Sequence, residues 1–313
     1  MSNKIDEHRE TYFNVPIALF VIVILVQSCT KIIEIDIPAN EPRLVVNSLF
    51  TDGHRFKVHL SNTASAFDYT TPVVEDGLIR LFCNDEEIDT LIFNNGYYYS
   101  NINAEQGEKY SLIVSAPGME SVSSEDIIPE KTLIESYEHR DSIMMDDNNH
   151  PVMQFEIRFT DKPGPNFYEL SIIAQYYVAG FQYRHPVWYN YISDPTLVST
   201  GLLDYSPESL VFTDKLFDGK ETTIKANYSI QTGEIPLVNG GPEYSYLLFV
   251  SFRSVSESYY NYIRKQIIYQ YSLESNIFTG LPDPVHMYSN ITGGYGIFAG
   301  YSSDNKTINV VIR

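Results

Sequence analysis

The sequence predicts a mainly β protein. It should begin with an immunoglobulin-like β-sandwich, followed by a second β-rich sandwich or barrel-like domain with one amphipathic helix. Short segments in which apolar and polar residues alternate recur along the chain, separated by Gly, Pro and Asn turn signals. The 313 residues include 25 Tyr and 17 Phe, and aromatic residues favour strands. A hydrophobic content of 43% is enough to build a large core.

Residues 43–128 are predicted to form the immunoglobulin-like sandwich. In Arg55 to Leu60 the apolar residues Phe56, Val58 and Leu60 alternate with polar ones, as in a strand with one buried face. Asn95-Gly96 predicts a type I′ hairpin turn, because this pair tolerates the positive φ angles that the turn requires. The remaining strands are predicted at residues 44–46, 77–83, 87–93, 97–100 and 110–114, and Cys83 is expected to be a small buried residue.

Residues 129–313 are predicted to form the second β-rich domain. Strands are expected at residues 153–159, 167–177 and 246–252, and glycines in residues 293–300 indicate bulges or close strand packing. A helix is expected at residues 255–273, because Ser254 and Glu257 resemble a capping box and apolar residues then recur at helical spacing. The polar run at residues 146–150 is interpreted as a solvated loop, with a Ca²⁺ site as the alternative.

The segment 178–220 is an insertion that is too long for an ordinary connection and too aromatic for a disordered one. Tyr183, Trp188, Tyr189 and Tyr191 are therefore candidate ligand-binding residues that could form an aromatic platform. The alternative is that the same side chains fill the core of a tyrosine-rich β domain.

Composition and motifs exclude several classes of function. The net charge of −19 argues against a nucleic-acid partner, because phosphate contacts need clustered Lys and Arg. The sequence contains no HExxH, CxxC, P-loop or G-x-S-x-G motif. We therefore expect no catalytic residue, no metal ligand and no cofactor, and a protein that is not an enzyme.

The N-terminus is interpreted as a lipoprotein signal peptide, residues 1–28. Its apolar run, residues 16–26, is too short to span a membrane, although acidic residues outnumber basic ones before it. Val26-Gln27-Ser28-Cys29 resembles a bacterial lipobox, in which Cys29 becomes the first mature residue and carries lipid such as palmitate. Residues 29–42 would then be a tether, and Cys83 would be the one ordinary thiol of the mature protein.

The order of several segments resembles the DUF4249 family of Bacteroidota lipoproteins. The resemblance begins with Ile35-Asp36-Ile37-Pro38 after Cys29 and with Pro42-Arg43-Leu44-Val45-Val46. Further matching segments are residues 77–81, 107–112, 212–214, 217–220, 259–260, 284–285, 289–291 and 294–298. No single segment is decisive, but their order is fairly specific and covers nearly the whole mature chain.

The resemblance implies an outer-membrane lipoprotein associated with a TonB-dependent receptor. It favours a non-enzymatic role in capturing a ligand for that transporter, with a surface adhesion or structural lipoprotein as the alternative. The family supplies no catalytic residues to transfer. Thr30-Lys31-Ile32 replaces the acidic run that often follows the lipid-bearing Cys of surface-exported lipoproteins, so either leaflet of the outer membrane stays open.

Overall fold

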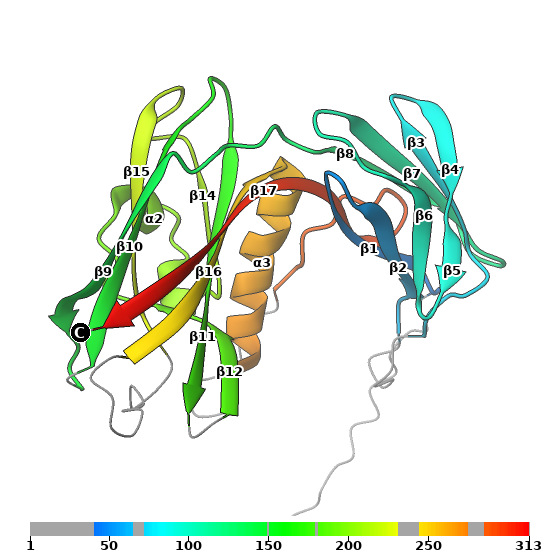
Figure 1. The fold of residues 1–313 in the computed structure, drawn as a ribbon. Coiled ribbons are helices and arrows are strands. Elements are labelled where there is room, and N and C mark those ends of the chain that lie inside the picture. Colours follow the sequence, from blue (N-terminus) through cyan, green and yellow to red (C-terminus); the bar gives the residue numbers. More distant parts are fainter. Residues whose placement is uncertain are drawn as a thin grey trace, which may run out of the picture. The chain divides into compact units, whose positions relative to one another are not determined.

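The structure is a computed structural model that describes residues 41–64, 72–148, 150–178, 181–230, 244–274 and 285–312. Within these residues the chain is mainly β, which confirms the predicted fold class, and its one long helix is α3 (Glu257–Glu274) (Figure 1). The signal segment, Cys29 and most of the tether lie outside the described residues and stay predictions. Across the described ranges, no helix is both long enough and apolar enough to cross a lipid bilayer.

The largest sheet has nine strands. Eight of them form a continuous row, and β14 (Leu210–Thr213) pairs separately with β11. The row runs β12 (Phe181–Pro186), β11 (Phe167–Val178), β16 (Tyr244–Val255), β17 (Tyr295–Ile312), β1 (Leu44–Thr51), β2 (Arg55–Asn62), β6 (Tyr97–Asn103) and β5 (Ile92–Asn94). It therefore contains strands from both predicted domains, residues 43–128 and residues 129–313.

Two four-stranded sheets pack against different parts of this long sheet, and each pair encloses its own hydrophobic core. The first runs β4 (Glu86–Thr90), β3 (Leu78–Cys83), β7 (Lys109–Ser115) and β8 (Val122–Ile127). The second runs β13 (Trp188–Tyr189), β15 (Glu221–Ser229), β10 (Pro151–Thr160) and β9 (Ser136–Met145). Two short helical segments, α2 (Pro195–Val198) and η1 (Leu203–Tyr205), lie between β13 and β14 in the chain.

The N-terminal core follows the predicted alternation. Phe56, Val58 and Leu60 of β2 are fully buried, while their polar neighbours reach solvent to different degrees. Asn95 and Gly96 both have positive φ, at 49° and 84°, and they connect β5 to β6 as the hairpin pattern predicts. Burial of such large apolar side chains contributes roughly 1.5–3 kcal/mol each, which makes this core a main source of stability.

The C-terminal core is mostly aromatic. The alternation predicted for residues 153–159 is confirmed, because all four apolar residues of that set are buried in β10. The ring of Phe252 lies 4.7 Å from that of Phe159 and 5.3 Å from that of Tyr168. Tyr168 also donates its hydroxyl hydrogen to the buried carboxylate of Asp161, so the polar end of this large side chain is satisfied.

Strand β17 belongs to both sandwiches. Its first part pairs in parallel with β1, from Val45 opposite Tyr295 to Thr51 opposite Tyr301. Its remainder pairs antiparallel with β16 along that strand's whole length. Phe298 accordingly lies in the N-terminal core, whereas Val310 lies in the C-terminal core.

Helix α3 packs on the nine-stranded sheet through a third apolar cluster. Tyr259, Tyr260 and Ile267 of the helix are buried against Ile297 and Ala299 of β17 and other residues. The helix was predicted over residues 255–273, and its capping residue was predicted wrongly.

The capping residue is Ser256. Its hydroxyl accepts a hydrogen bond from the backbone N–H of Tyr259 at 3.2 Å. Ser254 still belongs to β16, and its hydroxyl accepts from the N–H of Thr132 at 3.1 Å. Strand β16 includes Ser254 and ends at Val255, because its ladder with β17 extends to that residue.

The glycines of β17 allow the backbones of neighbouring strands to approach closely, which confirms the prediction made for residues 293–300. At Gly296, where φ is +110°, a Cβ atom would lie 2.0 Å from the carbonyl oxygen of Val46. At Gly300 a Cβ atom would lie 2.3 Å from the carbonyl oxygen of Ile127. Only glycine fits at these positions without moving β1 or β8.

Replacing Gly296 by Ala should destabilise the protein strongly. Backbone strain at positive φ adds to the steric overlap with Val46, so we expect a loss of about 3 kcal/mol or more in the free energy of unfolding. Gly107→Ala is the matched control, because Gly107 has φ +82° but open space around it. Chemical denaturation of both variants measures the difference, and equal losses would contradict the close-approach argument.

Asp126, near the end of β8, connects this strand with Gly300 of β17 and with Ser256, the residue before α3. Its Oδ2 accepts hydrogen bonds from the Ser256 hydroxyl at 2.5 Å and the Gly300 N–H at 3.2 Å, and Oδ1 accepts from the Ile127 N–H at 2.9 Å. Burial raises the pKa of this carboxyl to about 6, because desolvation outweighs the three hydrogen bonds. The neutral form of Asp126 is therefore favoured by folding.

Stability should fall as pH rises from about 4 to above 6. The folded state holds the Asp126 proton over this interval and the unfolded state has released it, so ionisation favours unfolding by on the order of 2–3 kcal/mol. Asp126→Asn should remove this part of the pH dependence, whereas Asp147→Asn, at an exposed position, should leave it unchanged. Urea denaturation between pH 4 and pH 7.5 tests this, and an unchanged slope in Asp126→Asn would contradict it.

Candidate functional site

The aromatic insertion, residues 178–220, is largely built from defined elements. It contains β12, β13, α2, η1 and β14, which place its side chains on two different sheets. Strand β12 extends the nine-stranded sheet, while β13 pairs with β15 of the second four-stranded sheet. The predicted site residues are therefore distributed over both sheets.

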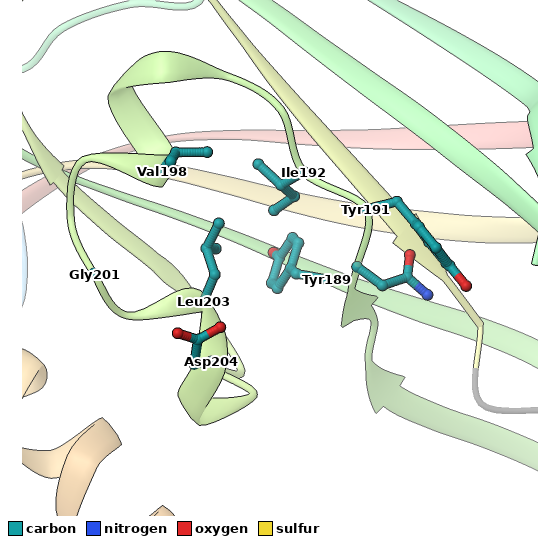
Figure 2. Close-up of a pocket in the computed structure, with 8 residues that line it drawn as sticks. Tyr189, Tyr191, Ile192, Val198, Gly201, Leu203 and Asp204 are labelled. Atoms are coloured by element: carbon teal, nitrogen blue, oxygen red, sulfur yellow. The ribbon is translucent and has the colours of Figure 1, made fainter.

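One pocket lies in this insertion, with a volume of about 400 Å³. Its lining residues are Tyr189, Asn190, Tyr191, Ile192, Val198, Gly201, Leu203 and Asp204. Figure 2 shows the side chains of Ile192, Val198 and Leu203 gathered with the Tyr189 ring around one space, with Tyr191 and Asp204 on opposite sides of it. The pocket thus has an aliphatic wall and polar margins.

Tyr189 and Tyr191 are the two predicted residues that line this pocket, and they do so differently. Tyr189 is 9% exposed, and its hydroxyl accepts from the Ile172 N–H at 2.9 Å and donates to the Leu170 carbonyl at 3.4 Å. Burial raises the pKa of Tyr189, so it stays neutral at physiological pH. Tyr191 is 45% exposed and offers an open ring to a ligand.

Trp188 and Tyr183 are not among the lining residues. Trp188 precedes Tyr189 on β13, so it points to the opposite face of the sheet, where it is 56% exposed. Tyr183 lies on β12, with its ring stacked on that of Tyr176 at a centroid distance of 5.7 Å. The structure brings together two of the four predicted residues and places the other two elsewhere.

Tyr191 has a backbone conformation that few residues of its type adopt. Its φ is +49°, and its carbonyl oxygen accepts a hydrogen bond from the Asn227 side chain at 2.7 Å. Tyrosine in this region carries a strain of roughly 1–3 kcal/mol, which the surrounding contacts must offset. Such strain concentrates at ligand-binding positions, which favours a binding role for this residue.

Asn190 also lines this pocket. Its side-chain nitrogen donates to the Ser229 hydroxyl at 2.9 Å, whereas its side-chain oxygen is buried and has no hydrogen-bond partner among the described residues. An unpaired buried acceptor costs about 1–3 kcal/mol, which the packing around the pocket must offset.

Asp194 holds the wall of the pocket in place, and sequence reasoning did not identify it. Its side chain caps α2 by accepting from the N–H of Thr196 at 2.9 Å and of Leu197 at 3.4 Å. Its other oxygen accepts from the N–H of Lys225 on β15 at 3.0 Å. The available signal was Asp194 directly before Pro195, because Asp is a preferred N-cap and Pro a preferred first helical residue.

The chemistry that this pocket offers is binding. It presents the Tyr191 ring, an aliphatic wall and the exposed Asp204 carboxylate. These groups suit a small ligand with an apolar frame and hydrogen-bond donors. The Tyr189 hydroxyl is already engaged with the backbone and serves to position the ring.

A second group of polar residues lies in loops of the C-terminal sandwich. Carboxylate oxygens of Asp161, Asp214 and Asp218 lie within 4.8 Å of one another, a spacing that could hold a metal ion. Each of them also accepts a backbone N–H, from Gly219, Asn166 and Gly164 respectively. These hydrogen bonds tie the loops before β11 and after β14 together, which explains the cluster as a structural feature.

Other titratable groups are also engaged within the fold. Nε2 of His139 forms a hydrogen bond with the Tyr228 hydroxyl at 2.7 Å, and burial lowers the pKa of His139. Cys83 is half-buried rather than fully buried, and burial raises the pKa of its thiol. The side chain of Asp146 accepts from the N–H groups of Asn148 and His150, which closes the turn after β9.

Comparison with known proteins identifies one family. The family model described as "Domain of unknown function (DUF4249)" matches residues 30–307, which is most of the chain. No curated protein matches the chain.

Asp194→Ala should lower the free energy of unfolding by about 2 kcal/mol, because three backbone N–H groups lose their acceptor. Asp204→Ala removes the same group from an exposed position in the same insertion and should change stability by less than about 0.5 kcal/mol. Guanidinium denaturation of the two variants measures both values. Similar losses would mean that Asp194 does not hold the pocket wall.

Proposed function

The chain belongs to the DUF4249 family, and on that premise we propose that it is an outer-membrane lipoprotein that captures a ligand for a TonB-dependent transporter. The observation that carries the ligand-capture part is the insertion pocket, with its aliphatic wall, its open Tyr191 ring and the exposed Asp204 carboxylate. The role is non-enzymatic: the ligand is held and released unchanged. In support, the one titratable group buried in the pocket, the Tyr189 hydroxyl, is occupied by the backbone.

Membrane attachment in this proposal depends on Cys29. The lipobox that ends at this residue supports cleavage after Ser28 and lipidation of the new N-terminus. Several acyl chains together hold a protein on a bilayer far more stably than one chain does. The tether of residues 29–42 can span at most roughly 50 Å, so the sandwiches stay within reach of a neighbouring barrel.

Adhesion is the second candidate function, and exposed aromatic side chains favour it. Phe181 at the start of edge strand β12 is 70% exposed, and Trp188 is 56% exposed. Aromatic residues of this kind are enriched at protein interfaces. A surface lipoprotein that contacts other cells or matrix could use them directly.

Affinity purification of the lipidated chain from its own outer membrane distinguishes these roles. We expect a stoichiometric TonB-dependent receptor in the mass spectrum, and we expect it to be lost with Cys29→Ser because the chain is no longer anchored. Val198→Trp, which fills the pocket from a half-exposed position, should keep the receptor but reduce uptake of its substrate at least tenfold. Repeated absence of a receptor, with a deletion phenotype in attachment, would favour adhesion instead.

A further inference from the structure

A second pocket, separate from the insertion, lies where strands β1, β16 and β17 adjoin in the nine-stranded sheet. Its volume is about 340 Å³, and its lining includes Arg253 and Ser251 of β16 and Tyr301 of β17. His54 and Arg55, at the β1–β2 turn and the start of β2, complete its basic side. Strand β17 is hydrogen-bonded to β1 on one side and to β16 on the other, so the lining residues from these strands keep fixed positions relative to one another.

The residues that line this pocket are basic or neutral, whereas the protein as a whole is acidic. The chain carries a net charge of −19, yet the lining contains two Arg and one His and no carboxylate. Ser251, Ser303 and Asn305 add neutral polar groups, while the exposed side chain of Leu49 provides an apolar wall. Such a concave basic surface concentrates anions.

Arg253 is held rigidly at this pocket. Its Nη1 donates to Glu169 Oε2 at 2.6 Å and to the Tyr259 hydroxyl at 2.8 Å, and its guanidinium lies over the Tyr301 ring at 5.0 Å. Ser209 and Tyr259 donate to Glu169 as well, so the buried carboxylate is fully engaged. Arg253 is therefore already oriented before any ligand binds.

Part of this guanidinium is available to a ligand. Both hydrogen bonds to described residues leave from Nη1, so Nη2 has no hydrogen-bond partner among these residues. The side chain is nevertheless 28% exposed, while Glu169 is only 5% exposed. Burial alone would lower the pKa of Arg253, but the charge of Glu169, its hydrogen bond and the nearby Tyr259 and Tyr301 together raise the pKa, so the positive charge is secure.

We propose that this pocket binds a small organic anion, with its carboxylate or phosphate group between Arg253 and Arg55 and its apolar part against Leu49. Planar guanidinium groups bind these oxyanions through paired hydrogen bonds. This second binding site is separate from the insertion pocket and goes beyond the ligand-capture function. The anionic group comes from a soluble molecule or from a phospholipid headgroup, two sources with the same chemistry.

Inorganic phosphate is the probe for this site. The lipidated full chain in non-ionic detergent is titrated with phosphate at constant ionic strength, and binding is followed by broadening of the phosphorus NMR line. We expect saturable binding that acetate competes away. Arg55→Gln, at an exposed position, should weaken it about fivefold or more, whereas Arg158→Gln, the same change on β10, should alter it less than twofold.

The results of this titration distinguish a lipid headgroup from a soluble anion, and they can also contradict the proposal. Displacement of phosphate by micelles containing phosphatidylglycerol, but not by phosphatidylcholine, assigns the site to a lipid headgroup. No displacement by either assigns it to a soluble anion. Absence of saturable broadening, or equal weakening by Arg55→Gln and Arg158→Gln, overturns the proposal. Val198→Trp should leave phosphate binding unchanged, so failure here is distinguishable from failure of ligand capture at the insertion pocket.

Discussion

The close approach of β17 to its neighbours is the constraint on which the rest of the structure depends. The parallel ladder with β1 requires that no side chain stand between Gly296 and the Val46 carbonyl. Once that approach is made, Phe298 enters the N-terminal core and the rest of the strand pairs with β16. Both sandwiches, α3 and the basic pocket are positioned by this one strand.

Local sequence patterns predicted most strands because half-buried strands carry their own signal. The alternations in β2 and β10, and the hairpin at Asn95-Gly96, depend on neighbours within a few residues. The pairing of Val45 with Tyr295 joins positions roughly 250 residues apart, and no local pattern encodes it. The same limit explains the helix cap: the local pattern favoured Ser254, but a ladder with distant β17 keeps that residue in a strand.

The candidate site was partly predictable for a related reason. Aromatic composition singled out the insertion, and it correctly drew attention to a segment that contains a pocket. Composition does not say which way a side chain points, and alternation on β13 sends Trp188 and Tyr189 to opposite faces. The basic pocket could not be predicted, since Arg55 on β2 and Arg253 on β16 line one pocket only because β1 and β17 connect their strands in one sheet.

The distance in sequence between β1 and β17 also determines when the N-terminal sandwich can fold. That sandwich lacks one of its own strands, and the core residue Phe298, until residues 295–301 have been synthesised. Domains usually complete their folding in order as the chain emerges, but here the first core must wait for a strand that follows the second core in the sequence. A nascent chain without these residues therefore keeps the edge of β1 unpaired, and it stays open to chaperones and proteases until β17 has been made.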